Sequence, residues 1–216
     1  MQSGQNKNKA EEIIKLLKKE YPDVKLALTS RNPLELIVAT ILSAQCTDER
    51  TNKVTKRLFK KYKNIKDYAK ANLRIFEKEI KPCGFYKNKA KNIIVACQKI
   101  IENFKGRVPQ TMEEITTLPG VGRKTANIVL ASAFGKTEGI AVDTHVRRLS
   151  QRLGLSGNND PTKIEDDLME IIPKRNWGEF SLLLIEHGRK ICLARNPLCL
   201  KCILKHICPS FDYFTK

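Results

Sequence analysis

Long apolar runs are missing from this chain of 216 residues. No stretch reaches the roughly 18 consecutive apolar residues that a membrane-spanning helix requires. The first ten residues are polar and lysine-bearing, and they lack the apolar core of a secretion signal. We therefore expect no membrane segment and no export, and we place the chain in the cytoplasm of a bacterial or archaeal cell.

Acidic residues are also few. The chain has 23 Asp and Glu against 40 Lys and Arg, which gives a formal net charge of +17. A surplus of this size is the electrostatic signature of nucleic-acid binding. An anionic membrane surface is the weaker alternative, because the basic residues are spread along the chain and do not gather on one amphipathic helix.

Alternating strand patterns are absent as well. The only β-like stretch, residues 139–142, is too short to found a sheet, so the pattern predicts an all-α fold. A first helix should end before Pro22, and Thr111 should cap a short helix that begins at Met112. The other helices are predicted over residues 33–45, 48–62, 72–80, 88–104, 123–134, 144–153, 161–172 and 177–192.

Four of the seven cysteines lie close together near the C-terminus. They are separated by six, two and five residues and comprise Cys192, Cys199, Cys202 and Cys208. Thiolates at this spacing can converge on a tetrahedral zinc ion or on an iron–sulfur cluster, and the spacing alone does not choose between them. Two disulfides are the disfavoured alternative, because nothing indicates an oxidising compartment. The other three are expected to be buried apolar residues: Cys46, Cys83 and Cys97.

A glycine-bearing turn precedes the helix predicted at residue 123. Without Cβ atoms, Gly120 and Gly122 let backbone amides approach a phosphate, to which the following helix also presents its positive end. A tight turn with glycines chosen for geometry is an equal alternative for the pattern alone. Lys124 stands in the first helical turn, where the helix dipole disfavours a second positive charge and favours the nucleophilic free amine. A phosphate-contacting lysine is the plainer interpretation.

Asp143 follows an apolar segment and precedes the next predicted helix. Helix capping is the ordinary role of an aspartate at such a position. The same position would keep the carboxylate ionised and oriented, as the stabilisation of a cationic sugar transition state requires. His145, two residues later, is more often a packed or capping histidine than a catalyst.

Three motifs, in this order, resemble the endonuclease III family of helix-hairpin-helix DNA glycosylases. They are the turn Leu-Pro-Gly-Val-Gly-Arg-Lys of residues 118–124, the Val-Asp-Thr-His segment of residues 142–145, and the C-terminal Cys-x6-Cys-x2-Cys-x5-Cys. The segment Leu-Ser-Ala-Gln-Cys-Thr-Asp of residues 42–48 and the Gly-Phe-Tyr turn of residues 84–86 are similar to two further family segments. The resemblance covers nearly the whole chain.

The resemblance implies an enzyme that excises oxidised pyrimidines, such as thymine glycol, from duplex DNA and then cuts the strand by β-elimination. Lys124 would be the nucleophile that attacks C1′ and forms a Schiff base, and Asp143 would assist the departure of the base. The four C-terminal cysteines would hold a [4Fe-4S] cluster. The partner would be double-stranded DNA with a damaged base or an abasic site, which would associate a monomeric protein with the nucleoid.

The family fold implies two lobes and a set of DNA contacts. A six-helix barrel lobe would span residues 25–137, and a cluster lobe would join residues 1–24 to 138–216. Gln45 and Phe85 take the positions of side chains that the family inserts into the duplex, although the family often has a leucine where this chain has Phe85. Without the resemblance, the two residues would be interpreted as a buried glutamine and a core phenylalanine. Further contacts are expected from Gly120, Val121, Gly122, Arg123, Thr125, His145, Arg189, Lys190, Arg195 and Lys201.

Two other functions share some of these sequence features. A monofunctional adenine-mismatch glycosylase resembles the chain in its hairpin, aspartate and cysteines, but that family lacks a lysine at the position of Lys124 and carries a further C-terminal domain. A non-enzymatic DNA-binding module with a zinc-held tail would explain the charge and the cysteines, and would leave Lys124 and Asp143 as structural residues.

Overall fold

The structure is a computed structural model that describes residues 2–215. Within those residues every regular element is helical and none is a strand, which confirms the all-α prediction. The chain forms two compact units, one made of Met1–Lys25 together with Gly139–Lys216, and the other of Leu26–Glu138. The barrel and cluster lobes implied by the resemblance stay predictions for these units.

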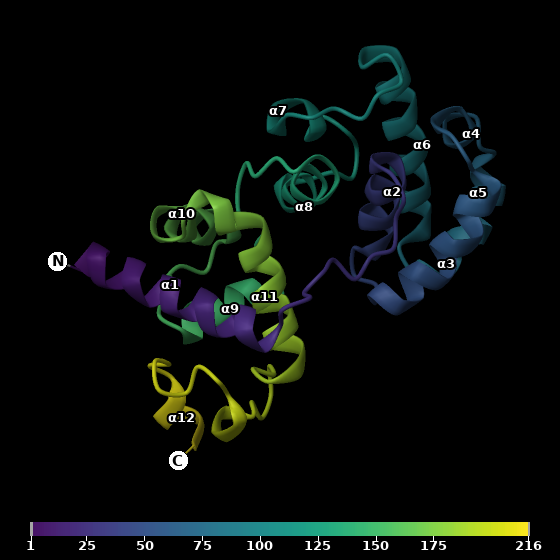
Figure 1. Ribbon diagram of the computed structural model, residues 1–216. Helices are drawn as coiled ribbons and strands as arrows, with labels where there is room; N and C mark the ends of the chain where they lie inside the picture. Colours follow the sequence, from purple (N-terminus) through teal and green to yellow (C-terminus); the bar gives the residue numbers. More distant parts are fainter. Residues whose placement is uncertain (1, 216) are drawn as a thin grey trace. The chain divides into compact units, whose positions relative to one another are not determined.

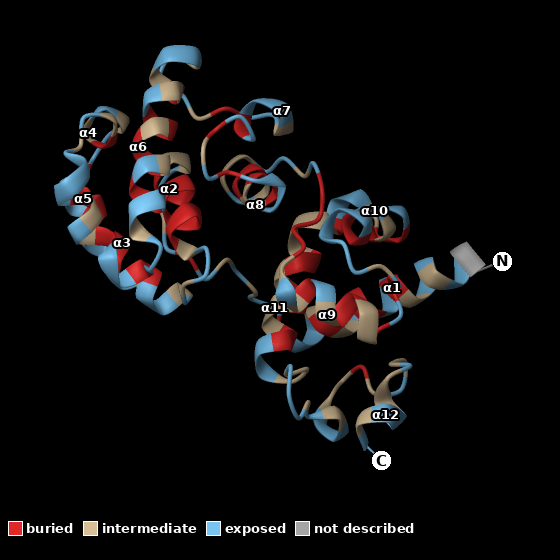
Figure 2. Ribbon diagram, turned by 180° about the vertical axis from the view of Figure 1, so that it is seen from behind, coloured by how far each residue is buried: buried red, intermediate tan, exposed pale blue. Residues whose placement is uncertain are grey.

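The unit Leu26–Glu138 is built around α2, whose residues 35–42 are all buried. It packs against α3, α6 and α8, so its sequence is apolar on nearly every side (Figures 1 and 2). The elements of this unit are α2 (Pro33–Ser43), α3 (Asp48–Lys61), α4 (Ile65–Ala69), α5 (Leu73–Ile80), η1 (Lys81–Cys83), α6 (Tyr86–Asn103), α7 (Met112–Ile115) and α8 (Arg123–Phe134).

The other unit joins the first helix of the chain to its C-terminal helices. α11 packs against α1 and α9, and α10 packs against α1 and α9 as well, around a core that includes Leu17, Leu149 and Phe180 (Figure 2). Its elements are α1 (Gln2–Glu20), α9 (Thr144–Arg152), α10 (Pro161–Ile171), η2 (Lys174–Asn176), α11 (Trp177–Lys190), η3 (Cys199–Lys201) and α12 (Phe211–Thr215).

Local sequence decides where most helices begin. Side chains of Thr47, Thr111 and Asp160 each accept a hydrogen bond from a backbone N–H in the first turn of the helix that follows. Three longer helices, α6, α8 and α11, depart from this pattern. Their N-caps are Phe85, Gly122 and Asn176, and none of these residues provides a side-chain cap. Their first-turn amides are therefore left to other partners.

Candidate functional site

The turn between α7 and α8 is fixed by two buried side chains and one glycine. Leu118 and Val121 are buried, and the Val121 N–H donates to the Leu118 carbonyl at 3.0 Å. Gly120 has φ +81°, and a Cβ built on it would lie 3.1 Å from the side chain of Asn92. Both the backbone conformation and the lack of space therefore require glycine there. Because its side chain is buried, Val121 can contact DNA only through its backbone.

The start of α8 is open to a ligand. Gly122 is its N-cap, with φ −87° and ψ 176°, and it has no side chain that could bond to the first-turn amides. A Cβ built on Gly122 would meet no atom within 4 Å, so the space beside this residue is open. Uncapped amides and the positive end of a helix dipole form an anion-binding position.

The predicted nucleophile stands at this same turn. Gly122, Arg123 and Lys124 are exposed, and Thr125 is half-buried. The Lys124 amine is thus on the surface, within one turn of the open amides. Geometry of this kind is compatible both with a phosphate contact and with attack on a sugar carbon held beside that phosphate.

Asp143 caps α9 with one of its two carboxylate oxygens. Its Oδ1 accepts from the backbone N–H of His145 and of Val146, at 2.8 Å each. The capping role expected from sequence is therefore confirmed. Its Oδ2 makes no hydrogen bond with residues 4–215. The side chain is half-buried, so the cap orients the carboxylate while one oxygen stays available.

His145 lies between α9 and α11. Its Nδ1 is 3.2 Å from the guanidinium of Arg148, and a Cβ on Gly188 of α11 would come within 2.8 Å of the same nitrogen. Burial lowers the pKa of His145; Asp143 opposes this shift, whereas Arg148 and Arg189 add to it. The imidazole is therefore a packed, neutral group at neutral pH, and its predicted contact with DNA stays a prediction.

Gln45 and Phe85 both project from strained backbone. Gln45 has φ 52° and Phe85 has φ 45°, a left-handed conformation that residues with a Cβ rarely adopt. Gln45 is exposed, and Phe85 keeps 65% of its surface exposed. The alternatives of a buried glutamine and a core phenylalanine are therefore wrong. Both residues are presented to solvent, as side chains that enter a duplex would have to be.

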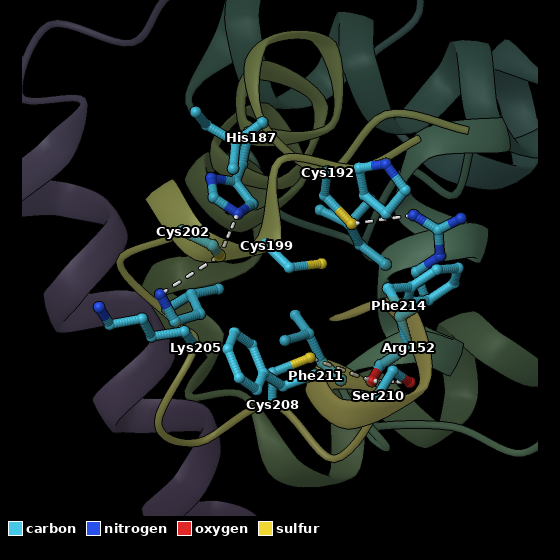
Figure 3. A pocket seen from close by; sticks show the side chains of 15 residues that line it. Arg152, His187, Cys192, Cys199, Cys202, Lys205, Cys208, Ser210, Phe211 and Phe214 are labelled. Carbon is cyan, nitrogen blue, oxygen red and sulfur yellow. Dashed lines mark hydrogen bonds between the residues drawn. The ribbon is translucent and has the colours of Figure 1, made fainter. Parts of the chain in front are cut away.

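The four C-terminal cysteines line one cavity. Figure 3 shows Cys192, Cys199, Cys202 and Cys208 around a shared space whose wall includes Arg152 and Phe214. All seven cysteines are free thiols, so the alternative of two disulfides is wrong. Cys83 and Cys97 are buried as predicted, whereas Cys46 is half-buried.

The chemistry of the donor set fits a metal centre. Burial raises the pKa of the Cys202 thiol to about 11, and it also raises the pKa of Cys199 and Cys208. A bound cation is what converts such buried thiols to thiolates. In the described part of the chain, no three His, Cys, Asp or Glu side chains are grouped closely enough to hold one metal ion. The four thiols therefore surround a space without closing on a point.

A buried histidine connects these cysteines to the first helix. The His187 Nδ1 lies 3.0 Å from the Tyr21 hydroxyl, and its Nε2 lies 3.3 Å from Cys202 Sγ. Burial lowers the pKa of His187 to about 4, so the ring is neutral and carries one proton. When the Tyr21 hydroxyl donates to Nδ1, that proton sits on Nε2 and faces the sulfur. Sequence patterns did not reveal this residue.

Two arginines of α9 bind the segment that begins at Cys192. Arg152 donates to Cys192 Sγ at 3.2 Å and to the Leu193 carbonyl at 2.7 Å, and Arg148 donates to the Cys192 carbonyl at 2.9 Å. Their spacing of four residues places them on one helix face. α9 thus begins directly after its cap, Asp143, and ends against residues 192–194. In the sequence, two basic residues on one helix face look the same whether they bind another part of the chain or DNA.

The remaining basic candidates are on the surface. Arg189, Lys190, Arg195 and Lys201 are all exposed. Lys190 also forms an ion pair with Glu186 at 2.7 Å, and Arg189 has a partner too. These four share one unit with Asp143, His145 and the cysteines, whereas Gln45, Phe85 and the turn with Lys124 belong to the other unit.

Similarity to known proteins covers most of the chain. Residues 38–174 match the HhH-GPD superfamily of base excision DNA repair proteins. The chain is 56% identical to endonuclease III of Synechocystis over 204 residues, which cover 94% of this chain and 93% of that protein. It is 47% identical to endonuclease III of Bacillus subtilis over 87% of this chain and 86% of that protein.

Solved structures give the same family. A non-covalent endonuclease III–DNA complex superposes with a TM-score of 0.92 and 43% identity, covering 97% of this chain and 98% of that one. A trapped endonuclease III–DNA covalent intermediate has the same TM-score and identity, over 97% of this chain and 99% of that one. Among the described residues, no helix is long and apolar enough to cross a membrane.

Proposed function

We propose a function from one premise: the chain belongs to the HhH-GPD superfamily of base excision DNA repair proteins and, within it, to the endonuclease III family. It is a bifunctional DNA glycosylase and AP lyase. Its substrate is double-stranded DNA that contains an oxidised pyrimidine, such as thymine glycol, or an abasic site. The protein acts as a monomer in the cytoplasm, on the DNA of the nucleoid.

Binding begins at the phosphate backbone. The N–H groups at the start of α8, which no N-cap side chain engages, donate to a phosphate oxygen, and the net charge of +17 attracts the duplex over a longer range. Contacts of this type carry no base sequence, which suits an enzyme that must find lesions in any context. Arg123, Thr125, Arg189, Lys190, Arg195 and Lys201 supply further contacts to the backbone.

Access to C1′ requires that the damaged nucleotide leave the base stack. Flipping costs a few kcal/mol, and less where damage has already weakened the pair. The exposed side chains of Gln45 and Phe85 enter the gap, where the Phe85 ring stacks on a neighbouring base. By filling the gap, the two side chains keep the flipped nucleotide from returning to the base stack.

Lys124 carries the chemistry. Its amine attacks C1′ and displaces the base, while the Asp143 carboxylate stabilises the positive charge that develops on the sugar. The sugar ring opens, and loss of the amine proton leaves an imine between Lys124 and C1′. Removal of a C2′ proton then expels the 3′ phosphate, which cuts the strand, and water hydrolyses the imine to release the enzyme. The exposed position of Lys124 beside the open amides is the observation that supports this assignment.

Cys192, Cys199, Cys202 and Cys208 hold a [4Fe-4S] cluster. When bound, such a cluster cross-links the C-terminal loop through four iron–sulfur bonds. Arg152 and His187 face two of the four sulfurs and fix their positions. A brown protein with iron and acid-labile sulfide would support this centre. A colourless protein that contains zinc would contradict it.

Borohydride trapping tests the nucleophile. The protein is incubated with a duplex that contains thymine glycol and is then reduced, and the covalent protein–DNA complex is quantified by gel electrophoresis. We expect the parent protein and Lys91→Ala, which removes an exposed lysine of α6, to form the complex, and we expect Lys124→Ala to form none. Undiminished trapping by Lys124→Ala would show that another amine attacks. Failure of the parent to release thymine glycol would refute the substrate.

A further inference from the structure

Lys89 is a buried lysine that the chemistry above does not use. Its side chain lies on α6, four residues after Phe85, and only 5% of its surface is exposed. Its Nζ donates to the Leu42 carbonyl and to the Cys83 carbonyl, at 2.8 Å each. An ammonium group is rarely buried without such partners, because burial alone favours the neutral amine. Burial does lower the pKa of Lys89, against the opposing effect of Cys83 and Cys46.

Both carbonyls belong to residues that lie two or three positions before a strained residue. Leu42 lies in the last turn of α2, three residues before Gln45, and the turn that follows pairs the Cys46 N–H with the Ser43 carbonyl. The Leu42 carbonyl therefore lacks the usual helical partner four residues on. Cys83 ends η1, one residue before Gly84 and two before Phe85. One ammonium group thus bonds to the C-terminal ends of two separate segments, α2 and η1.

The hydrogen bonds of Lys89 matter because the backbone is strained close to both of them. Left-handed backbone costs a residue with a Cβ about 1–2 kcal/mol, and it persists only where the surroundings enforce it. Gln45 and Phe85 both have it, at φ 52° and 45°, and Gly84 between Cys83 and Phe85 has φ 68°. Neither strained residue lies inside a helix that would impose its conformation. Through its two hydrogen bonds, Lys89 contacts both the segment before Gln45 and the segment before Phe85.

We propose that Lys89 is a positioning residue, which sets the separation of Gln45 and Phe85 so that both side chains enter the duplex together. This inference rests on the proposed function, because it assumes that the two side chains fill the gap left by a flipped nucleotide. Lys89 itself touches neither DNA nor the reacting atoms. Without it, the two segments move independently, and the flipped nucleotide loses the support of one side chain or the other.

A substrate that needs no flipping separates this role from catalysis. Lys89→Met keeps the length of the side chain but cannot donate to either carbonyl. We expect it to excise thymine glycol from a duplex on the order of 10- to 100-fold more slowly than the parent. Its borohydride trapping on an abasic site in single-stranded DNA should match the parent. Lys91→Met, which removes an exposed lysine from the same helix, should leave both reactions unchanged.

A double-mutant cycle decides whether Lys89 acts through the two inserted side chains. Lys89→Met is also placed in a protein that carries Gln45→Ala and Phe85→Ala, and we expect little further loss there. A similar fold-loss in both backgrounds, or no loss in the parent background, would overturn the inference. If Lys89→Met does not fold, Lys89→Leu, which also lacks a donor, goes through the same cycle with the same two outcomes. A parent protein that excises no thymine glycol refutes the proposed function instead.

Discussion

The geometry of Asp143 combines an observed capping role with room for the catalytic role proposed for it. Its Oδ1 accepts two backbone N–H groups of α9, and its Oδ2 has no hydrogen bond with residues 4–215. The cap thereby holds the carboxylate in one orientation without consuming its second oxygen. An oriented charge of this kind costs no reorganisation when positive charge develops on a sugar. Capping and catalysis are therefore compatible here, and a substitution can separate them.

Asparagine and alanine at residue 143 should differ in stability but not in catalysis. Asparagine caps a helix about as well as aspartate, whereas alanine costs about 1 kcal/mol. We expect Asp143→Asn to unfold in urea close to the parent and Asp143→Ala to unfold earlier. Excision of thymine glycol should fall on the order of 100-fold in both, because both lack the charge. If Asp143→Asn retains full excision, the cap alone explains the residue.

Helices were predictable where a local signal marks their ends. α8 begins at Arg123 and ends at Phe134 as the pattern predicts, and α10 begins at Pro161 after its cap Asp160. The prediction for α2 was two residues too long, because the chain turns at Gln45 into a left-handed conformation that periodicity does not reveal. α4, with the capping box of Asn64 and Asp67, was missed, although that signal is present in the sequence.

The packing of α9 on α11 depends on a glycine. A Cβ on Gly188 would lie 2.8 Å from His145 Nδ1 and 3.0 Å from a guanidinium nitrogen of Arg148. Arg148 also donates to the Gly188 carbonyl at 3.0 Å, so it has little freedom to withdraw. We expect Gly188→Ala to destabilise the protein by about 1–3 kcal/mol, measured by urea unfolding.

Gly157 provides the matched control for this substitution. It belongs to the same unit, and a Cβ built on it would meet no atom within 4 Å. Gly157→Ala should therefore leave the free energy of unfolding within about 0.5 kcal/mol of the parent. Equal losses in the two variants would mean that the contact between α9 and α11 is not the cause.

At the scale of the whole molecule, the sequence predicts candidate catalytic and metal-binding residues but not the residues that support them. Lys124, Asp143 and the four cysteines were proposed from short motifs, whose spacing is a local property of the chain. The bond between Tyr21 and His187 joins residues that are 166 positions apart, and Arg152 reaches Cys192 across 40 positions. Neither partner can be inferred from a periodic pattern. Lys89 was hidden for the same reason, among 40 basic residues that composition assigns to the surface.

Removal of the proposed metal centre should loosen one unit and spare the other. Each unit has its own hydrophobic core, and half-buried Cys192, Cys202 and Cys208 pack only against the core that contains Leu17 and Phe180. Without metal, the buried thiols lose the bonds that would join them, and Arg152 loses a fixed partner.

We expect oxidative removal of the cluster to speed hydrogen–deuterium exchange in residues 192–211 and in the last turn of α9. Exchange in α2 and α6 should not change, because their core contains none of these cysteines. Equal acceleration in both units would show that the metal centre supports the whole fold, and no acceleration in residues 192–211 would show that the four cysteines hold no structural metal.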